Sequence, residues 1–189
     1  MKRVDALRAV YPQLADRIVV TIMGAVAAEL QGIGHRPNFF YLQHAMGLAS
    51  SMGLGIALAR PERQVIVFDG DGSVLMNLGG LTTLARYRPR NLVHVVFDNE
   101  SLLSVGGFPT ATSTGSDLAK IAAAAGVPRT STVSALDAFT RAFDEALAAG
   151  DLTTVVAKVE AVGPSKFVTD LSLLENRFEF QRYLQRDVR

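Results

Sequence analysis

The sequence contains no cysteine, so neither a disulfide framework nor a cysteine-based metal site is possible. This absence fits a cytoplasmic protein. Positive and negative charges nearly cancel, at a formal net charge of +1. The arginines are scattered, and no basic stripe with interleaved aromatic residues marks a nucleic-acid surface. We therefore expect a protein without a nucleic-acid partner.

Long apolar runs are also missing. The longest weakly charged stretch, residues 39–59, is rich in Gly, Ser, Gln and His and lacks the continuous apolar length of a membrane span. The N-terminal segment MKRVDALRAVYPQLADR carries acids and has no apolar core, unlike a signal peptide. No repeat, linker or low-complexity segment divides the 189 residues. We expect one cytoplasmic domain covering residues 1–189, with no membrane association.

What the sequence does contain is two short apolar runs, Val65–Phe68 and Leu92–Phe97, each followed by a polar corner. Because they are short, rich in β-branched residues and bounded by turn signals, they predict buried parallel strands. Apolar residues at helical spacing between them predict one crossover helix: Leu75, Leu78, Leu81, Leu84 and Ala85. In such a βαβ unit, Asp71 and Asn99 lie side by side at the edge where open α/β sheets bind ligands.

The same patterns predict the remaining elements. Further strands are expected at 17–22, 39–42, after 128–131 and at 152–159, and helices at 3–11, 25–30, 47–59, 117–125 with Ser116 as its cap, 136–149 and about 171–184. The last helix contains leucines and aromatic residues among charged residues, which is typical of a helix that packs on a partner or back on the sheet. The stretch after Asn99 reads as a long functional loop.

The edge formed by the two corners offers oxygen ligands. Asp71 has a carboxylate, Asn99 has an amide oxygen, and the turn after it can direct the main-chain carbonyl of Ser101 to the same point. Mg²⁺ prefers such a site, where a few protein oxygens are completed by water and phosphate oxygens. The sequence therefore predicts a magnesium site.

The flanking glycines point to a phosphate. Without a Cβ atom, Gly70 and Gly72 let the backbone bend sharply and come close to a ligand. Ser73 is expected to open a helix whose free N–H groups attract an anion. A phosphate group held beside a magnesium ion is the chemistry that this stretch favours.

These residues resemble the thiamine diphosphate enzymes, which share Gly-Asp-Gly, a spacer and Asn-Asn. Here the motif reads Gly70-Asp71-Gly72, residues 73–97 and Asp98-Asn99, so the first Asn is replaced and the second, the family's metal ligand, is kept. The wording FDGDGSVLMNLGGLTTLA and FDNESLLSVGGFPT is most similar to the cofactor-binding half of sulfopyruvate and phosphonopyruvate decarboxylases. The resemblance implies an α/β fold, a three-layer, doubly wound parallel sheet of about six strands, binding thiamine diphosphate and Mg²⁺.

The resemblance also assigns site residues. The Mg²⁺ ligands would be Asp71, Asn99 and Ser101. The cofactor-binding residues would be Gly24, Ala45, Met46, Gly47, Gly70, Asp71, Gly72, Ser73, Asn99, Ser101, Leu102 and Leu103. Met46 would prop the cofactor into its bent conformation, a role that suits a flexible side chain that packs on a flat ring. The alternative is that Met46 is an ordinary core residue.

His44 stands where the resembling enzymes usually have glycine. One interpretation is a histidine hydrogen-bonded at a helix start. The other is a catalytic residue whose imidazole projects into the active site and donates to a substrate carbonyl or carboxylate. His94 falls within a predicted strand and is expected at its surface.

Other positions depart from the resembling decarboxylases. Small polar residues that help to bind the diphosphate are replaced by the apolar run at 25–28. Leu103 stands where a polar residue, often His, is common, and Phe108 where Gln is common. Because a buried charged substrate group needs polar partners, these changes favour a substrate less charged or more aromatic than sulfopyruvate or phosphonopyruvate.

The catalytic glutamate of the family comes from a separate pyrimidine-binding domain. The elements predicted for this chain all belong to one sheet and its helices, so we expect no such domain within it. The resemblance therefore implies half of an active site, completed by a pyrimidine-binding (alpha) subunit of similar size in an α2β2 or larger assembly. The leading hypothesis is the diphosphate- and Mg²⁺-binding subunit of a lyase that decarboxylates a 2-oxo acid. The alternatives are a carbon–carbon lyase or carboligase acting on an aromatic hydroxyketone, and a catalytically silent binding or regulatory subunit.

Overall fold

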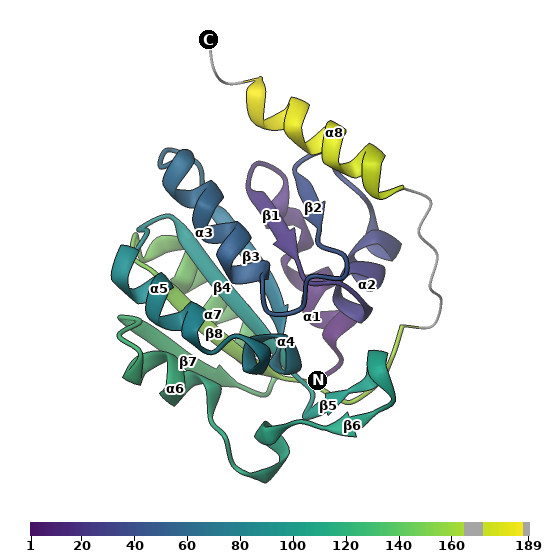
Figure 1. Cartoon of the computed structure of the whole chain (residues 1–189), viewed down its shortest axis with the longest axis vertical. Helices are drawn as coiled ribbons and strands as arrows, with labels where there is room; N and C mark the ends of the chain where they lie inside the picture. The colour runs from purple at the N-terminus through teal and green to yellow at the C-terminus, as the bar shows by residue number, and fades with distance from the viewer. Residues whose placement is uncertain (165–171, 187–189) are drawn as a thin grey trace.

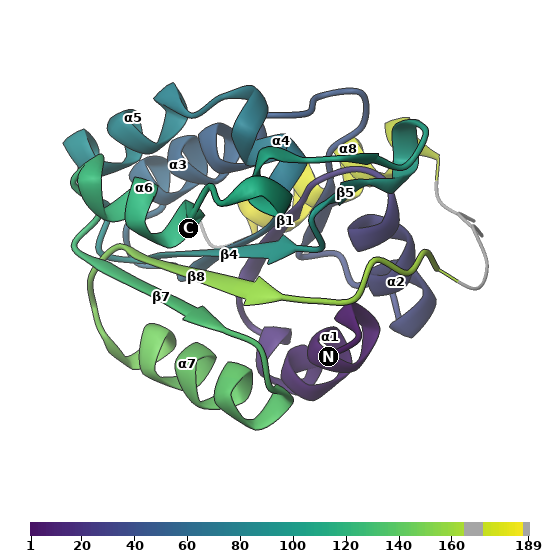
Figure 2. The same ribbon diagram turned by 90° about the horizontal axis from the view of Figure 1, so that it is seen from below.

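The computed structural model describes residues 1–164 and 172–186. Its central sheet has six parallel strands in the order β2-β1-β3-β4-β8-β7, with helices on both faces (Figures 1 and 2). The strands are β1 (Ile18–Thr21), β2 (Phe39–Tyr41), β3 (Val65–Gly70), β4 (Leu92–Asp98), β7 (Arg129–Val133) and β8 (Thr153–Lys158). The predicted doubly wound α/β sheet is confirmed.

The two apolar runs form neighbouring central strands. β3 pairs with β4 in parallel register, with Gly70 opposite Phe97. Both strands are almost wholly buried because helices cover both faces of the sheet. Asp71 and Asn99 therefore follow two adjacent strand ends, as the sequence predicts. β1 lies on the other side of β3, and the strand order reverses direction between these two strands. The carboxyl ends of β1, β3 and β4 therefore meet at the position where open α/β sheets bind ligands.

Helices of both layers pack on this sheet (Figure 2). One face carries α3 (Ala49–Ala59), α4 (Asp71–Met76), α5 (Gly79–Tyr87) and α6 (Leu118–Ala124), and the other carries α1 (Arg3–Val10), α2 (Ala25–Ile33) and α7 (Leu136–Ala148). On the second face Phe68 and Phe97 stack in contact with Phe139 and Phe143 of α7. Burying each such ring contributes about 1.5–3 kcal/mol, which holds the two layers together.

The single crossover helix predicted between β3 and β4 is wrong. The structure has two helices, α4 and α5, separated at Asn77 and Leu78. The side-chain amide of Asn77 donates to the carbonyl of Gly47 at 2.8 Å, and the Asn77 carbonyl accepts the N–H of Gly80 at 2.9 Å. The chain bends at this point, and Leu78 is 37% exposed rather than part of one apolar stripe.

Three smaller predictions also differ. The loop after Asn99 contains a two-stranded antiparallel hairpin of β5 (Ser101–Leu102) and β6 (Phe108–Pro109), with 3₁₀ turns η2 (Leu103–Val105) and η3 (Ala111–Thr114). The cap of α6 is Asp117 instead of Ser116, since its side chain accepts the N–H of Lys120. His94 is fully buried instead of exposed, because β4 is covered on both faces.

The first and last elements of the described chain are helical. α1 runs into the 3₁₀ turn η1 (Tyr11–Leu14), which contains Pro12. The final helix, α8 (Leu173–Gln185), lies against β2, where Asn176 accepts the N–H of Tyr41 and donates to the carbonyl of Phe39. The helix thus packs back on the sheet; its predicted start at residue 171 lies outside the described residues. Of the helices described, none has the length and apolar character needed to cross a membrane.

Candidate active site

A small cavity of about 70 Å³ lies at the carboxyl ends of β1, β3 and β4. It is lined by Arg3, Ile22, Met23, Ala25, Val26, Met46, Gly70, Asp71, Gly72, Ser73, Phe97, Asn99, Ser101, Leu102, Leu103 and Ser104. Nine of the predicted site residues are in this set. The cavity is therefore the meeting point of the motif residues after β3, those after β4 and the turn before α3.

Asp71 begins α4 and is buried. Its Oδ2 accepts the hydroxyl of Thr110 at 2.6 Å and that of Thr112 at 3.4 Å. Burial raises the pKa of Asp71, and the charge of Asp98 raises it further, against the lowering effect of the Thr110 hydrogen bond. A buried carboxylate disfavoured in this way is stabilised by a cation, so the site suits a bound metal ion.

Asn99 and Ser101 line the same cavity as Asp71. The Asn99 side-chain oxygen accepts the N–H of Ser101 at 3.1 Å, which fixes its orientation in a tight turn. Glu100, between them, has a positive φ of 59°. This turn keeps the amide oxygen and the following carbonyl near the strand end, and the donor set of carboxylate, amide and carbonyl oxygens fits Mg²⁺.

The glycine at 72 lies against the hairpin. A Cβ atom there would lie 2.1 Å from Cδ2 of Leu102, so a larger residue would displace the Leu102 side chain. Ser73 does not open the helix, which begins at Asp71; its hydroxyl instead accepts the N–H of Gly47 at 3.0 Å. Ser73 thus ties the turn before α3 to the start of α4.

The remaining predicted cofactor residues surround the cavity unequally. Met46 is half-buried and lines it, and Leu103 lines it from η2. Gly24 and Gly47, both with positive φ, are turn residues beside the cavity and do not line it. Ala45 is half-buried, and its carbonyl accepts the N–H of Leu48. The roles of all these residues toward a cofactor stay predictions.

His44 lies five residues before α3, so the interpretation as a residue at a helix start is wrong. It is exposed, has a φ of 52° and makes no hydrogen bond with any other described residue. The left-handed backbone gives a physical reason for the glycine of the resembling enzymes, since only glycine adopts it without cost. A histidine kept in this conformation carries strain at the turn next to Met46.

Sequence reasoning missed a buried polar network behind Asp71. The hydroxyls of Thr110 and Thr112 are 2.8 Å apart, Thr112 donates to Asp98 at 2.8 Å, and Lys158 Nζ lies 2.8 Å from the other oxygen of Asp98. Burial alone would lower the pKa of Lys158, but hydrogen bonds to Asp98 and Glu100 outweigh it and raise the pKa. The phrase GGFPT, which contains Thr110, was the available signal.

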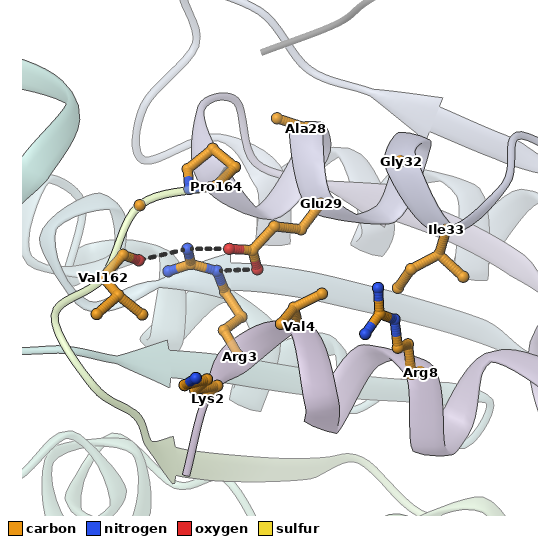
Figure 3. Close-up of a pocket in the computed structure, with 11 residues that line it drawn as sticks. Lys2, Arg3, Val4, Arg8, Ala28, Glu29, Gly32, Ile33, Val162 and Pro164 are labelled. Carbon is orange, nitrogen blue, oxygen red and sulfur yellow. Dashed lines mark hydrogen bonds and ion pairs between the residues drawn. The ribbon is translucent and has the colours of Figure 1, made fainter. Parts of the chain in front are cut away.

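A larger cavity of about 550 Å³ lies elsewhere, between α1 and α2 (Figure 3). Arg3 and Glu29 form a buried two-point ion pair there, with both contacts at 2.9 Å, and Arg3 also donates to the carbonyl of Val162. Figure 3 shows the Arg3 guanidinium enclosed between Glu29 and Val162. Among the described residues that line this cavity, Glu29 is the one acid, and it is engaged in that pair.

The fold and the site define an α/β domain with a small cavity at the carboxyl edge of its parallel sheet. The model of the family "Thiamine pyrophosphate enzyme, C-terminal TPP binding domain" matches residues 20–157. The chain belongs to this family of thiamine pyrophosphate enzymes. The predicted resemblance is thereby confirmed.

Among curated relatives, the chain is 38% identical over 158 residues to sulfopyruvate decarboxylase subunit beta of Methanocaldococcus jannaschii, covering 83% of each protein. It is 42% identical over 154 residues to phosphonopyruvate decarboxylase of Streptomyces viridochromogenes, but covers only 38% of that protein. The fold is also that of benzoylformate decarboxylase from Polynucleobacter necessarius, with a TM-score of 0.71, 20% identity, and coverage of 87% of this chain and 34% of that one.

Proposed function

We propose that this chain is the diphosphate- and Mg²⁺-binding subunit of a thiamine diphosphate-dependent lyase that decarboxylates a 2-oxo acid, with residues 1–189 forming one such domain. The observation that carries the proposal is the placement of Asp71 and Asn99 in one cavity at adjacent strand ends. The kinship with sulfopyruvate decarboxylase subunit beta supports the reaction class.

In this function Asp71, Asn99 and the Ser101 carbonyl hold Mg²⁺, and Gly72 and Ser73 offer backbone N–H groups to the diphosphate. Thiamine diphosphate, when bound, supplies a carbon nucleophile and an electron sink for breaking a bond beside a carbonyl. The residues of this chain bind the cofactor and orient it. Its apolar lining also keeps water from the reacting centre.

The hairpin supports a substrate with an apolar side group. Leu103 lines the cavity, and Phe108, in the strand directly opposite Leu102, is 66% exposed. Neither offers a hydrogen bond to a sulfonate or phosphonate group. This observation favours, as a second candidate function, a carbon–carbon lyase or carboligase that acts on an aromatic hydroxyketone.

The catalytic glutamate is proposed to come from a pyrimidine-binding alpha subunit in an α2β2 or larger cytoplasmic assembly. Two glutamates of this chain are already engaged, Glu29 with Arg3 and Glu100 with Lys158. The relative named subunit beta supports a second chain of this kind. His44 is proposed to donate to the substrate carbonyl or carboxylate.

The test is carbon dioxide release by this chain mixed with the candidate partner, Mg²⁺ and thiamine diphosphate. The substrates are sulfopyruvate, phosphonopyruvate and benzoylformate, with an aromatic hydroxyketone as the fourth arm. Release from a 2-oxo acid supports the proposal, and cleavage of the hydroxyketone alone supports the second candidate. Calorimetry that detects no cofactor binding in the mixture would overturn both and leave the catalytically silent subunit.

A further inference from the structure

We propose that Lys158 is a positioning residue for the metal ligand Asp71, acting through Asp98, Thr112 and Thr110; the inference rests on the function proposed above. The four groups between Lys158 and the cavity form one continuous chain of contacts. Their separations are 2.8 Å from Lys158 to Asp98, 2.8 Å from Asp98 to Thr112, 2.8 Å between the two hydroxyls and 2.6 Å from Thr110 to Asp71.

The number of available protons determines the directions of the hydrogen bonds made by Thr110 and Thr112. Each threonine hydroxyl has a single proton to donate, whereas an ionised carboxylate can only accept. Two protons therefore serve two carboxylates, and they do so only if Thr112 donates to Asp98 and Thr110 donates to Asp71. An ionised Asp98 accepts the Thr112 proton, so Thr112 does not donate to Asp71 Oδ2, which lies 3.4 Å from its hydroxyl, and Thr110 is the hydroxyl that donates to that oxygen. Neither hydroxyl uses the other Asp71 oxygen.

Lys158 is the residue that keeps this arrangement possible. Asp98 is 1% exposed, and a buried carboxylate without a partner is strongly disfavoured. Within the described part of the chain, Lys158 supplies the one cationic contact to Asp98, and the N–H of Glu100 supplies a second hydrogen bond at 3.1 Å. The replacement of the family's first Asn by Asp98 is thus matched by a lysine on the neighbouring strand β8.

The residues of this contact series come from distant parts of the sequence. Asp98 ends β4, Lys158 ends β8 directly opposite it, and Thr112 lies in η3 after the hairpin. Thr110 and Thr112 are buried. Lys158 is one-third exposed and also contacts Glu100, so it can be changed without opening the core.

The test uses K158M, D98N, the double variant D98N/K158M and, as a matched control, K120M on the exposed surface of α6. Mn²⁺ affinity is measured by electron paramagnetic resonance with thiamine diphosphate, on the full chain alone and with its partner subunit. K158M should weaken Mn²⁺ binding about 10- to 100-fold, the range for lost support of a metal ligand. The double variant should recover to within about threefold, because its neutral amide still accepts from Thr112. K120M should bind as the wild type does.

A second measurement needs no cofactor. The unfolding constants of K158M, T110V and K158M/T110V form a cycle between two residues that do not touch. Coupled residues should depart from the product of the single effects by more than about twofold. Additive effects, or K158M with unchanged Mn²⁺ affinity, would overturn the inference. Wild-type chain that binds no thiamine diphosphate with its partner would instead overturn the proposed function, and with it the metal role.

Discussion

Replacing His44 by glycine separates strain from function at one position. The φ of 52° costs a residue other than glycine about 1 kcal/mol or more in the folded state. Glycine removes that cost but gains freedom in the unfolded chain worth about 0.5–1 kcal/mol. H44G is therefore expected to leave the free energy of unfolding unchanged or to raise it by up to about 1 kcal/mol, because no described hydrogen bond is lost.

If the imidazole donates to the substrate, the same variant should lose about 100-fold in kcat/KM, at the low end for a proton-donating group. Stability is measured by urea unfolding and turnover by carbon dioxide release in the reconstituted complex. R88G is the control, since Arg88 also has a positive φ but caps α5 away from the cavity, and its turnover should be unchanged. H44G with wild-type turnover would refute the catalytic role and leave His44 as a strained turn residue.

Two further predictions concern buried charge. Burial raises the pKa of Asp71 in the folded state above its unfolded value, so the folded state binds this proton more tightly. The cofactor-free chain should therefore lose stability as pH rises from the ordinary Asp range through that raised pKa. D71N should abolish this pH dependence of the free energy of unfolding. Identical pH profiles for D71N and wild type would contradict it. E29Q leaves the Arg3 guanidinium buried without its anion and should cost about 3–5 kcal/mol in urea unfolding, whereas D137N, at an exposed ion pair, should change little.

The central part of the fold was predictable because its signals are local. The apolar runs of β3 and β4 carry β-branched residues and polar corners, so strand type, direction and the neighbouring positions of Asp71 and Asn99 follow from the sequence. The surface position predicted for His94 was wrong for a related reason. A strand covered on both faces has no outward side, so a polar residue within it is buried too.

What the sequence could not predict depends on contacts between distant residues. The break between α4 and α5 is fixed by Asn77, whose amide binds a carbonyl 30 residues earlier. Leucines at helical spacing give no sign of that bond. The network behind Asp71 likewise depends on the hairpin, which places Thr110 against Asp71 although the two residues are 39 positions apart in the sequence. Only the fold shows that Lys158 faces Asp98.

The charges around the cavity lead to a last prediction, on the need for metal. α4 has only six residues, so its N-terminus contributes a weak dipole to an anion. Among the described residues that line the cavity, Asp71 is the one acid and Arg3 the one cation, and Arg3 is already paired with Glu29.

A diphosphate placed beside Asp71 without a cation meets repulsion of about 4 kcal/mol at 4 Å and an effective dielectric of about 20, which is more than a 100-fold loss of affinity. Calorimetry should therefore detect thiamine diphosphate binding with Mg²⁺ and almost none with EDTA, and D71A should bind weakly under both conditions. Equal affinity with and without Mg²⁺ would mean that neutral backbone donors alone hold the diphosphate, and Asp71 would then have no role as a metal ligand.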